Sequence, residues 1–315
     1  MHAALIVRPG QPPSLADRGE PVARPGEVLV EVLAAPLTPL DLLCWGGTSY
    51  FGVPEVPYVP GVQGVGTVGG RAVWFPTTAG MAPGDGSMAA KALVHEEDLV
   101  FLPDNTNPVA LAALGLSAVA AHMALTWRGS LAAGESVIVL GTGAVGQAAV
   151  QLARIAGASR VVGAARSAQG CDRALAAGAD DVVLLASNDF ASLAARFTAA
   201  APDADLLLDP LFGVPAAAAA QALRPGGRWV NLGGSAGETS PITSSALRGR
   251  SLRLSGYTNN ELTRRQRADA ISAVARWAAR GLLAVDHETV PLADVAGAWQ
   301  RQAEGSTRGR IVLVP

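Results

Sequence analysis

The pattern of apolar and polar positions divides the chain near residue 110. Before that point, short apolar runs lie between segments rich in glycine and proline. Such runs predict short strands joined by turns, and therefore a small, mostly β domain. The clearest runs are Glu27–Ala35, Arg71–Phe75 and Lys91–Val94.

After residue 110, apolar runs alternate with alanine-rich segments of helical length. This alternation predicts a parallel sheet whose strands are joined by crossover helices, which is an α/β fold. The predicted strands are Ser136–Leu140, Arg160–Ala165, Asp181–Ala186, Asp205–Asp209 and Gly227–Gly234. Further along, the pattern predicts a long helix around Gln266–Arg280 and a last strand that begins at Arg310.

One segment is long and apolar enough to raise the question of a membrane span. Pro108–Trp127 contains 20 residues and no charge. It is rich in alanine, contains Gly115, His122 and Thr126, and has no basic cluster beside it. We therefore expect a buried helix of small residues and no membrane partner.

Composition and charge narrow the classes of partner. The chain has 24 basic and 26 acidic residues, a net charge of -2, and no basic run, which argues against nucleic-acid binding. The expected partners are a small molecule and a second copy of the chain. Cys44 and Cys171 are the only cysteines and form no CxxC pair. Their scarcity, and an N-terminus without a basic leader, favour a cytoplasmic location.

The strongest motif is VLGTGAVGQAAVQ, in which Gly141, Gly143 and Gly146 have the GxGxxG spacing. It follows a predicted strand and opens a predicted helix, the context that a dinucleotide-binding turn requires. The first glycine permits the tight turn, the second lets the backbone approach a diphosphate, and the third allows close helix packing. Ala144 and Val145 then begin the helix, whose N-terminal amides favour phosphate.

The end of the second strand indicates which dinucleotide is bound. Sites specific for NAD usually carry an acidic residue there, about 20 residues beyond the glycines. This chain has Ala165, which repels no 2′-phosphate, followed by Arg166 and Ser167, which are able to bind one. We therefore predict NADP(H). The alternative is that Arg166 only ends a solvated strand.

With these motifs in place, the chain resembles the medium-chain dehydrogenase/reductase superfamily over nearly its whole length. The landmarks are GEVLVEVLAAPLTPLD, VPYVPGVQGVG, GLSAVAAHMAL, LGTGAVGQAAVQLARIAGASRVV, RPGGRWVNLGG and GRIVLVP. The resemblance implies a GroES-like, mostly β catalytic domain formed by residues 1–110 and 257–315. It also implies a Rossmann domain over 111–256, an active site in the cleft between the two, and a homodimer.

The segment VPYVPGVQGVG departs from the zinc enzymes of that superfamily. In zinc alcohol dehydrogenases the matching segment has a His-Glu pair, and the His binds the catalytic zinc. This chain has Val62 and Gln63 there, and Thr38 matches the position of an earlier cysteine ligand. The structural zinc loop is also missing, since 81–90 reads MAPGDGSMAA. Catalytic zinc needs three protein ligands, so we expect no metal.

The chain is most similar to the zinc-free quinone oxidoreductase and enoyl reductase branch. Without a Lewis acid, an alkoxide formed from a simple ketone lacks its main electrophile. Hydride addition to a conjugated alkene or a quinone instead gives a delocalised enolate, which ordinary hydrogen-bond donors stabilise. The resemblance implies an NADPH-dependent reductase of such substrates. A carbonyl or imine reductase, and an NADPH-binding protein with little turnover like the crystallin members, remain alternatives.

The candidate catalytic residues are Tyr50, Tyr58 and Gln63. Tyr50 lies near the position of the proton-donating tyrosine of enoyl thioester reductases, but one residue further from Gly47 than in that motif. Tyr58 either faces the cleft or packs against the β domain. Gln63 either hydrogen-bonds a substrate carbonyl or the ribose, or holds a turn together.

The resemblance adds further candidates for binding the nicotinamide end of the cofactor. Ser117 matches a family serine or threonine near that ring, with helix packing as its other interpretation. The glycines that follow the strand WVNL let the backbone approach the ring, and Tyr257 follows the last predicted strand. The expected contacts are Ser117, Leu232, Gly233, Gly234 and Tyr257.

Overall fold

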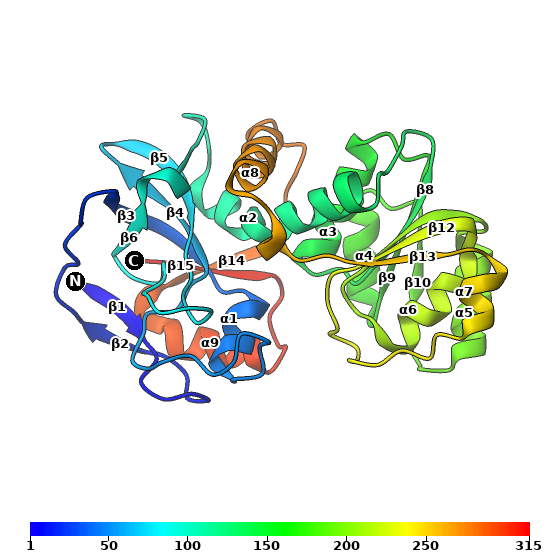
Figure 1. Ribbon diagram of the computed structural model, residues 1–315, viewed down its shortest axis with the longest axis horizontal. Helices are drawn as coiled ribbons and strands as arrows, with labels where there is room; N and C mark the ends of the chain where they lie inside the picture. The colour runs from blue at the N-terminus through cyan, green and yellow to red at the C-terminus, as the bar shows by residue number, and fades with distance from the viewer. The chain divides into compact units, whose positions relative to one another are not determined.

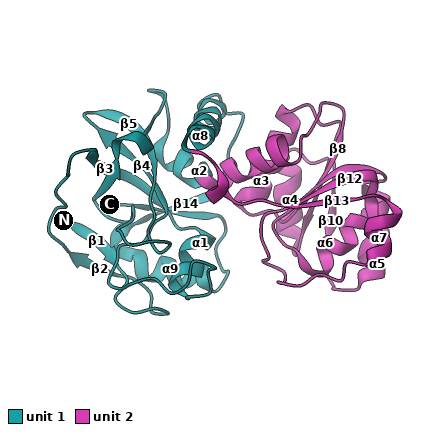
Figure 2. Cartoon of the chain, viewed as in Figure 1, with its two compact units in different colours: residues 1–115, 264–315 teal, residues 116–263 magenta.

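The computed structural model describes all 315 residues and divides them into two compact units (Figure 2). The first comprises residues 1–115 and 264–315, and the second comprises residues 116–263. The predicted α/β class, with a mostly β part and a Rossmann-like parallel sheet, is confirmed. The assignment of the first unit as a catalytic domain stays a prediction.

The first unit is built on a mixed sheet with the strand order β14-β15-β3-β4-β5-β7, in which β6 also pairs with β3 (Figure 1). Its strands are β3 (Glu27–Pro36), β4 (Gln63–Val68), β5 (Arg71–Pro76), β6 (Lys91–His95), β7 (Val100–Phe101), β14 (His287–Pro291) and β15 (Arg310–Val314). A separate hairpin joins β1 (His2–Leu5) to β2 (Ser14–Asp17). The helices are α1 (Pro39–Trp45), α8 (Arg264–Ala279) and α9 (Val295–Ala303), with 3-10 turns at Glu96–Asp98 and Leu292–Asp294.

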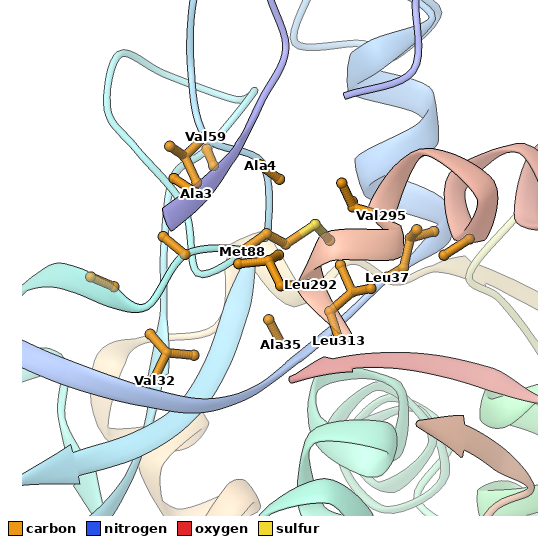
Figure 3. Close-up of a cluster of buried hydrophobic side chains, with 14 of the residues drawn as sticks. Ala3, Ala4, Val32, Ala35, Leu37, Val59, Met88, Leu292, Val295 and Leu313 are labelled. Carbon is orange, nitrogen blue, oxygen red and sulfur yellow. The ribbon is translucent and has the colours of Figure 1, made fainter. Parts of the chain in front are cut away.

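The two ends of the chain share the core of this unit. Strand β15 pairs antiparallel with β3, so that Leu313 lies opposite Ala35. Met88 packs among side chains from the beginning, middle and end of the chain (Figure 3). The buried residues around it include Ala3, Ala4, Val32, Ala35, Leu37, Val59, Leu292, Val295 and Leu313. The unit therefore cannot form its core without the C-terminal segment.

The second unit contains a six-stranded sheet, all parallel, with the order β10-β9-β8-β11-β12-β13. Its strands are β8 (Ser136–Leu140), β9 (Arg160–Ala165), β10 (Asp181–Leu184), β11 (Ala204–Asp209), β12 (Leu223–Asn231) and β13 (Arg253–Gly256). Its helices are α3 (Ala144–Ile155), α4 (Ala168–Ala176), α5 (Phe190–Ala200), α6 (Gly213–Ala219) and α7 (Ser244–Gly249), with 3-10 turns at Ala220–Ala222 and Asn259–Glu261. This is the doubly wound order, in which the chain reverses direction across the sheet between β8 and β11.

Most of the predicted strands agree with the structure to within a few residues, with two differences near the site. Strand β12 ends at Asn231, so Leu232–Gly234 forms a turn at its carboxyl end rather than the end of the strand. Strand β13 was not predicted, because RLSG is short and half polar. Its pairing with β12 supplies the backbone partners that its own sequence does not indicate.

Helix α2 (Pro108–Met123) contains the apolar segment that raised the membrane question. A π-helical turn, Ala124–Arg128, continues it. Pro108–Arg128 is long and apolar enough to cross a membrane, but 67% of its most apolar stretch is buried inside the protein. Gly115, at φ 30° and ψ -131°, interrupts the helix within this segment. The segment is therefore a buried helix of small residues, as expected.

Candidate functional site

The glycine turn after β8 gives each of its three glycines a separate function. Gly141 has a φ of 75°, a conformation that favours glycine. A Cβ atom on Gly146 would lie 1.9 Å from the Gly141 carbonyl oxygen, so only glycine allows α3 to pack this closely. A Cβ atom on Gly143 would meet nothing within 4 Å, because this residue faces open space. The turn therefore offers an accessible stretch of backbone of the kind that approaches a diphosphate.

The N-terminus of α3 lies directly beyond that open position. Gly143 is the N-cap residue, and no side chain caps the helix. The first-turn amides of Ala144 and Val145 have no carbonyl partner within the helix and carry the positive end of its dipole. Gln147 Nε2 donates to the Thr142 carbonyl (3.2 Å) and braces the turn. These groups fit the phosphates of a dinucleotide.

The carboxyl end of β9 lies beside this turn, because Ala164 is paired with Leu140. Ala165 is buried, and no carboxylate stands at the end of the strand. Arg166 is exposed and forms no ion pair. The Ser167 hydroxyl caps α4 by accepting a hydrogen bond from the Gly170 amide (3.1 Å) and still has its own proton to donate. The residues present fit a 2′-phosphate.

The turn after β12 lies at the carboxyl edge of the same sheet. The Leu232 amide donates to the Asp209 carbonyl (2.8 Å). A Cβ atom on Gly233 would lie 2.9 Å from the Pro210 carbonyl oxygen, and one on Gly234 would lie 3.0 Å from Glu238 Oε1. A Cβ atom is therefore disfavoured at Gly233, where it would meet backbone, whereas at Gly234 the exposed Glu238 side chain would have to move.

Tyr257 follows β13 and is buried. Its hydroxyl is 2.7 Å from Asn259 Oδ1, to which it donates, and Asn259 Nδ2 donates to the Leu116 carbonyl (3.0 Å). Burial raises the pKa of the Tyr257 hydroxyl, which keeps it protonated. The hydroxyl thus helps to fix the backbone next to Ser117, itself a buried residue. Sequence reasoning did not identify Asn259, which has no motif.

In the first unit, Gln63 is almost completely buried at the start of β4. Its Oε1 atom accepts a hydrogen bond from Trp74 Nε1 (2.9 Å). A Cβ atom on Gly115 would lie 2.2 Å from that same Oε1 atom, so the amide packs directly against the Gly115 backbone. These contacts give Gln63 a place inside the fold, and its catalytic role stays a prediction.

The two tyrosine candidates have opposite surroundings. Tyr50 is 77% exposed in the loop after α1 and packs against Phe51, with ring centroids 4.5 Å apart. Tyr58 belongs to the core of the first unit, and burial raises the pKa of its hydroxyl. Tyr50, Tyr58 and Gln63 therefore contact different neighbours. Of the two tyrosines, Tyr50 is largely exposed and Tyr58 is buried.

The positions that correspond to zinc ligands are used by the fold. Thr38 and Asp41 form a capping box at α1: the Thr38 hydroxyl lies 2.7 Å from Asp41 Oδ2, which also accepts from the Thr38 amide (2.8 Å). Asp41 Oδ1 accepts from the amides of Gly61 (3.1 Å) and Val62 (3.2 Å). Burial raises the pKa of Asp41, and these hydrogen bonds oppose the rise. Val62 itself is a buried apolar residue.

No group of three or more His, Cys, Asp or Glu side chains lies in an arrangement that would hold a metal ion. Cys44 is buried, and burial raises the pKa of its thiol to about 11. The side chains at and near the two positions are thus the hydroxyl of Thr38, which caps a helix, the buried carboxylate of Asp41 and the apolar side chain of Val62. They are not arranged as a set of zinc ligands.

A solved quinone oxidoreductase from Thermus thermophilus, determined alone and in complex with NADPH, is 30% identical to this chain. The match covers 100% of both chains with a TM-score of 0.82. The chain belongs to the medium-chain dehydrogenase/reductase superfamily. The family model described as "Zinc-binding dehydrogenase" matches residues 144–276, which include neither Thr38 nor Val62.

Curated relatives from the superfamily match over part of their length. A quinone oxidoreductase from Pongo abelii is 32% identical over 195 residues, which are 58% of this chain and 58% of that protein. A trans-enoyl reductase from Aspergillus terreus is 30% identical over 183 residues, 49% of this chain and 59% of that protein. The matches thus span under two thirds of these relatives. They are consistent with the resemblance to quinone and enoyl reductases drawn from the sequence.

Proposed function

We propose that this protein is a zinc-independent, NADPH-dependent reductase of activated C=C bonds or quinones. The observation that carries the proposal is the structural use of Thr38 and Val62, the positions where zinc enzymes of the superfamily bind metal: Thr38 caps a helix together with Asp41, and Val62 is a buried apolar residue. The quinone and enoyl reductases among its relatives support the same substrate class.

The choice of NADPH over NADH rests on the end of β9. An exposed guanidinium without a carboxylate partner binds a phosphate through charge-assisted hydrogen bonds at little desolvation cost. Arg166 meets this description, and Ser167 provides a neighbouring hydroxyl. Ala165, buried at the end of the strand, carries no charge that would repel the phosphate.

When bound, NADPH supplies the hydride. The chain's residues then have three tasks: to hold the cofactor, to stabilise the enolate oxygen, and to provide a proton or admit one from water. Backbone amides and neutral donors suffice for a delocalised enolate, where an alkoxide would require a stronger electrophile. We propose Tyr50 rather than Tyr58 as the proton donor, and the support for this choice is that Tyr50 is largely exposed whereas Tyr58 is buried.

The proposal is tested by NADPH oxidation against a panel of quinones, enones, acyl thioesters and imines. We expect turnover with quinones or conjugated carbonyl compounds and little with simple ketones and imines. Turnover confined to ketones or imines would favour a carbonyl or imine reductase. Tight NADPH binding without turnover on any of them would instead indicate an NADPH-binding protein. We also propose that the protein is a homodimer and is cytoplasmic. The molecular mass in solution tests the first proposal, and the distribution of the protein in cells tests the second.

A further inference from the structure

We propose that Asp209 and Asn231 act together as positioning residues for the nicotinamide half of the cofactor. The pair fixes the turn Leu232–Gly234, against which that half binds. This inference rests on the proposed function in one respect, namely that the chain binds NADP(H).

Asp209, the last residue of β11, carries a fully buried carboxylate that forms no ion pair. Its Oδ1 atom accepts hydrogen bonds from the amides of Leu211 (2.9 Å) and Phe212 (2.7 Å). Its Oδ2 atom accepts from Trp229 Nε1 (2.8 Å) and Asn231 Nδ2 (3.1 Å). Burial raises the pKa of this carboxyl, and the four donors offset part of that desolvation. A buried charge held this way specifies one geometry for the groups around it.

Asn231 connects the Asp209 carboxylate to the Leu232–Gly234 turn. Its Nδ2 atom lies 3.1 Å from Asp209 Oδ2, 3.2 Å from the Asp209 carbonyl oxygen and 2.8 Å from the Gly233 carbonyl oxygen. The position of a Cβ atom on Gly233 lies 2.9 Å from the Pro210 carbonyl oxygen, so the turns after β11 and β12 are in contact. The carboxylate, the amide and both turns therefore form one hydrogen-bonded unit at the carboxyl edge of the sheet.

The sheet topology indicates which half of the dinucleotide this unit meets. A doubly wound sheet binds the two mononucleotides on opposite sides of its switch point, outside the carboxyl ends of the strands. Here the switch point lies between β8 and β11. The glycine turn and Arg166 follow β8 and β9, which assigns the adenosine half to that side. The carboxyl ends of β11 and β12 therefore receive the nicotinamide half.

The test compares two ligands that differ only in the half in question. NADPH contains both halves, whereas 2′,5′-ADP contains only the adenosine end with its 2′-phosphate. Asn231→Ala removes the donor to the Gly233 carbonyl but leaves Asp209 three of its four donors. We expect the Kd for NADPH to rise roughly tenfold. The Kd for 2′,5′-ADP should stay within about twofold, because its binding groups lie on other strands. Titration calorimetry measures both without any substrate.

Asp209→Asn is the second variant, since its amide nitrogen would face the donors of Trp229 and Asn231. Asp209→Asn should also raise the Kd for NADPH relative to the Kd for 2′,5′-ADP. Asp205→Asn is the matched control, because Asp205 lies at the other end of β11 and accepts a hydrogen bond from the Ser136 amide (2.8 Å). We expect it to leave the ratio unchanged.

A folded Asn231→Ala variant with an unchanged ratio would overturn the inference, and so would equal weakening of both ligands. If Asp209→Asn fails to fold, Asn231→Ala decides alone. An unmodified protein that binds NADPH no more tightly than 2′,5′-ADP would also overturn it. Tight NADPH binding without turnover would contradict only the proposed reductase, and the positioning role would stand.

Discussion

Arg166 and Gln63 are polar side chains in opposite situations. Arg166 lies in solvent after a buried alanine and has no carboxylate partner, so a phosphate is the ligand that it is best suited to bind. Gln63 is buried, and its Oε1 atom already accepts a hydrogen bond from Trp74. A ligand that binds Gln63 Oε1 would have to displace or share the hydrogen bond from Trp74. A phosphate that binds Arg166 would displace no carboxylate. A single substitution at Arg166 is therefore expected to change the cofactor preference.

Arg166→Ala should lower the preference for NADPH over NADH by about 10- to 100-fold, the effect of losing a hydrogen bond to a charged group. The measurement is the ratio of Kd values for the two cofactors. Arg253→Ala serves as the control, because Arg253 is also exposed but begins β13 at the opposite edge of the sheet. An unchanged ratio in Arg166→Ala would show that the 2′-phosphate assignment is wrong.

Both thiols should be nearly unreactive in the folded protein. The thiolate is the reactive form, and burial raises the pKa of Cys44 to about 11 and also raises that of Cys171. At pH 8 we expect no rapidly reacting thiol in the native state and two after denaturation. The native rate should keep rising as the pH approaches 11. A fast native reaction at pH 8, assigned by Cys44→Ser and Cys171→Ser, would contradict this.

At the scale of elements, short segments are held by contacts with distant parts of the chain. Helix α1 is only seven residues long, yet its capping aspartate also binds the backbone at Gly61 and Val62. Helix α2 is interrupted at Gly115, where the backbone lies against the Gln63 amide. In both cases a buried polar side chain joins a helix to the segment that contains Val62 and Gln63.

Gly115→Ala should destabilise the protein by about 2 kcal/mol or more. The backbone there has φ 30° and ψ -131°, a sparsely populated conformation that costs a residue with a Cβ atom about 1–3 kcal/mol, and that atom would also clash with Gln63. Gly297→Ala in α9 is the control, since a Cβ atom there meets nothing and alanine favours helix by about 0.5–1 kcal/mol. Urea denaturation should move in opposite directions for the two variants. A Gly115→Ala protein as stable as the unmodified one would refute the clash.

At the scale of the whole molecule, the chain order and the spatial order differ. The first unit combines residues 1–115 with 264–315, and the second is a continuous insertion between them. The superfamily includes enzymes with and without zinc, so membership alone does not determine the chemistry. The zinc-independent reaction is proposed from the side chains at Thr38 and Val62, where the zinc enzymes have metal ligands.

Treatment with a strong zinc chelator should therefore leave NADPH-dependent turnover unchanged, and elemental analysis should find less than one zinc per chain. The physical reason is that catalytic zinc requires three protein ligands, and Thr38 and Val62 supply none of N, S or carboxylate type. A zinc alcohol dehydrogenase treated in parallel provides the control for chelation. Activity lost on chelation and restored by zinc would contradict a zinc-independent reaction.

Much of the fold and part of the candidate site could be predicted from local sequence patterns. The period of the apolar residues predicted the parallel sheet, since each strand was a short apolar run between helices. The glycine turn was also predictable, because its three glycines act within six residues. The sequence could not indicate β13, whose four residues become a strand by pairing with β12.

The fold class, the dinucleotide turn and the lack of zinc ligands at Thr38 and Val62 could all be predicted from the sequence. These follow from side-chain chemistry and from neighbours in the chain. Only the folded protein shows that Gln63 contacts Trp74 and Gly115, that Tyr58 is buried while Tyr50 is exposed, and that Asn231 donates hydrogen bonds to both Asp209 and Gly233. Burial and hydrogen bonding between distant residues depend on how the strands pair, which no local pattern contains.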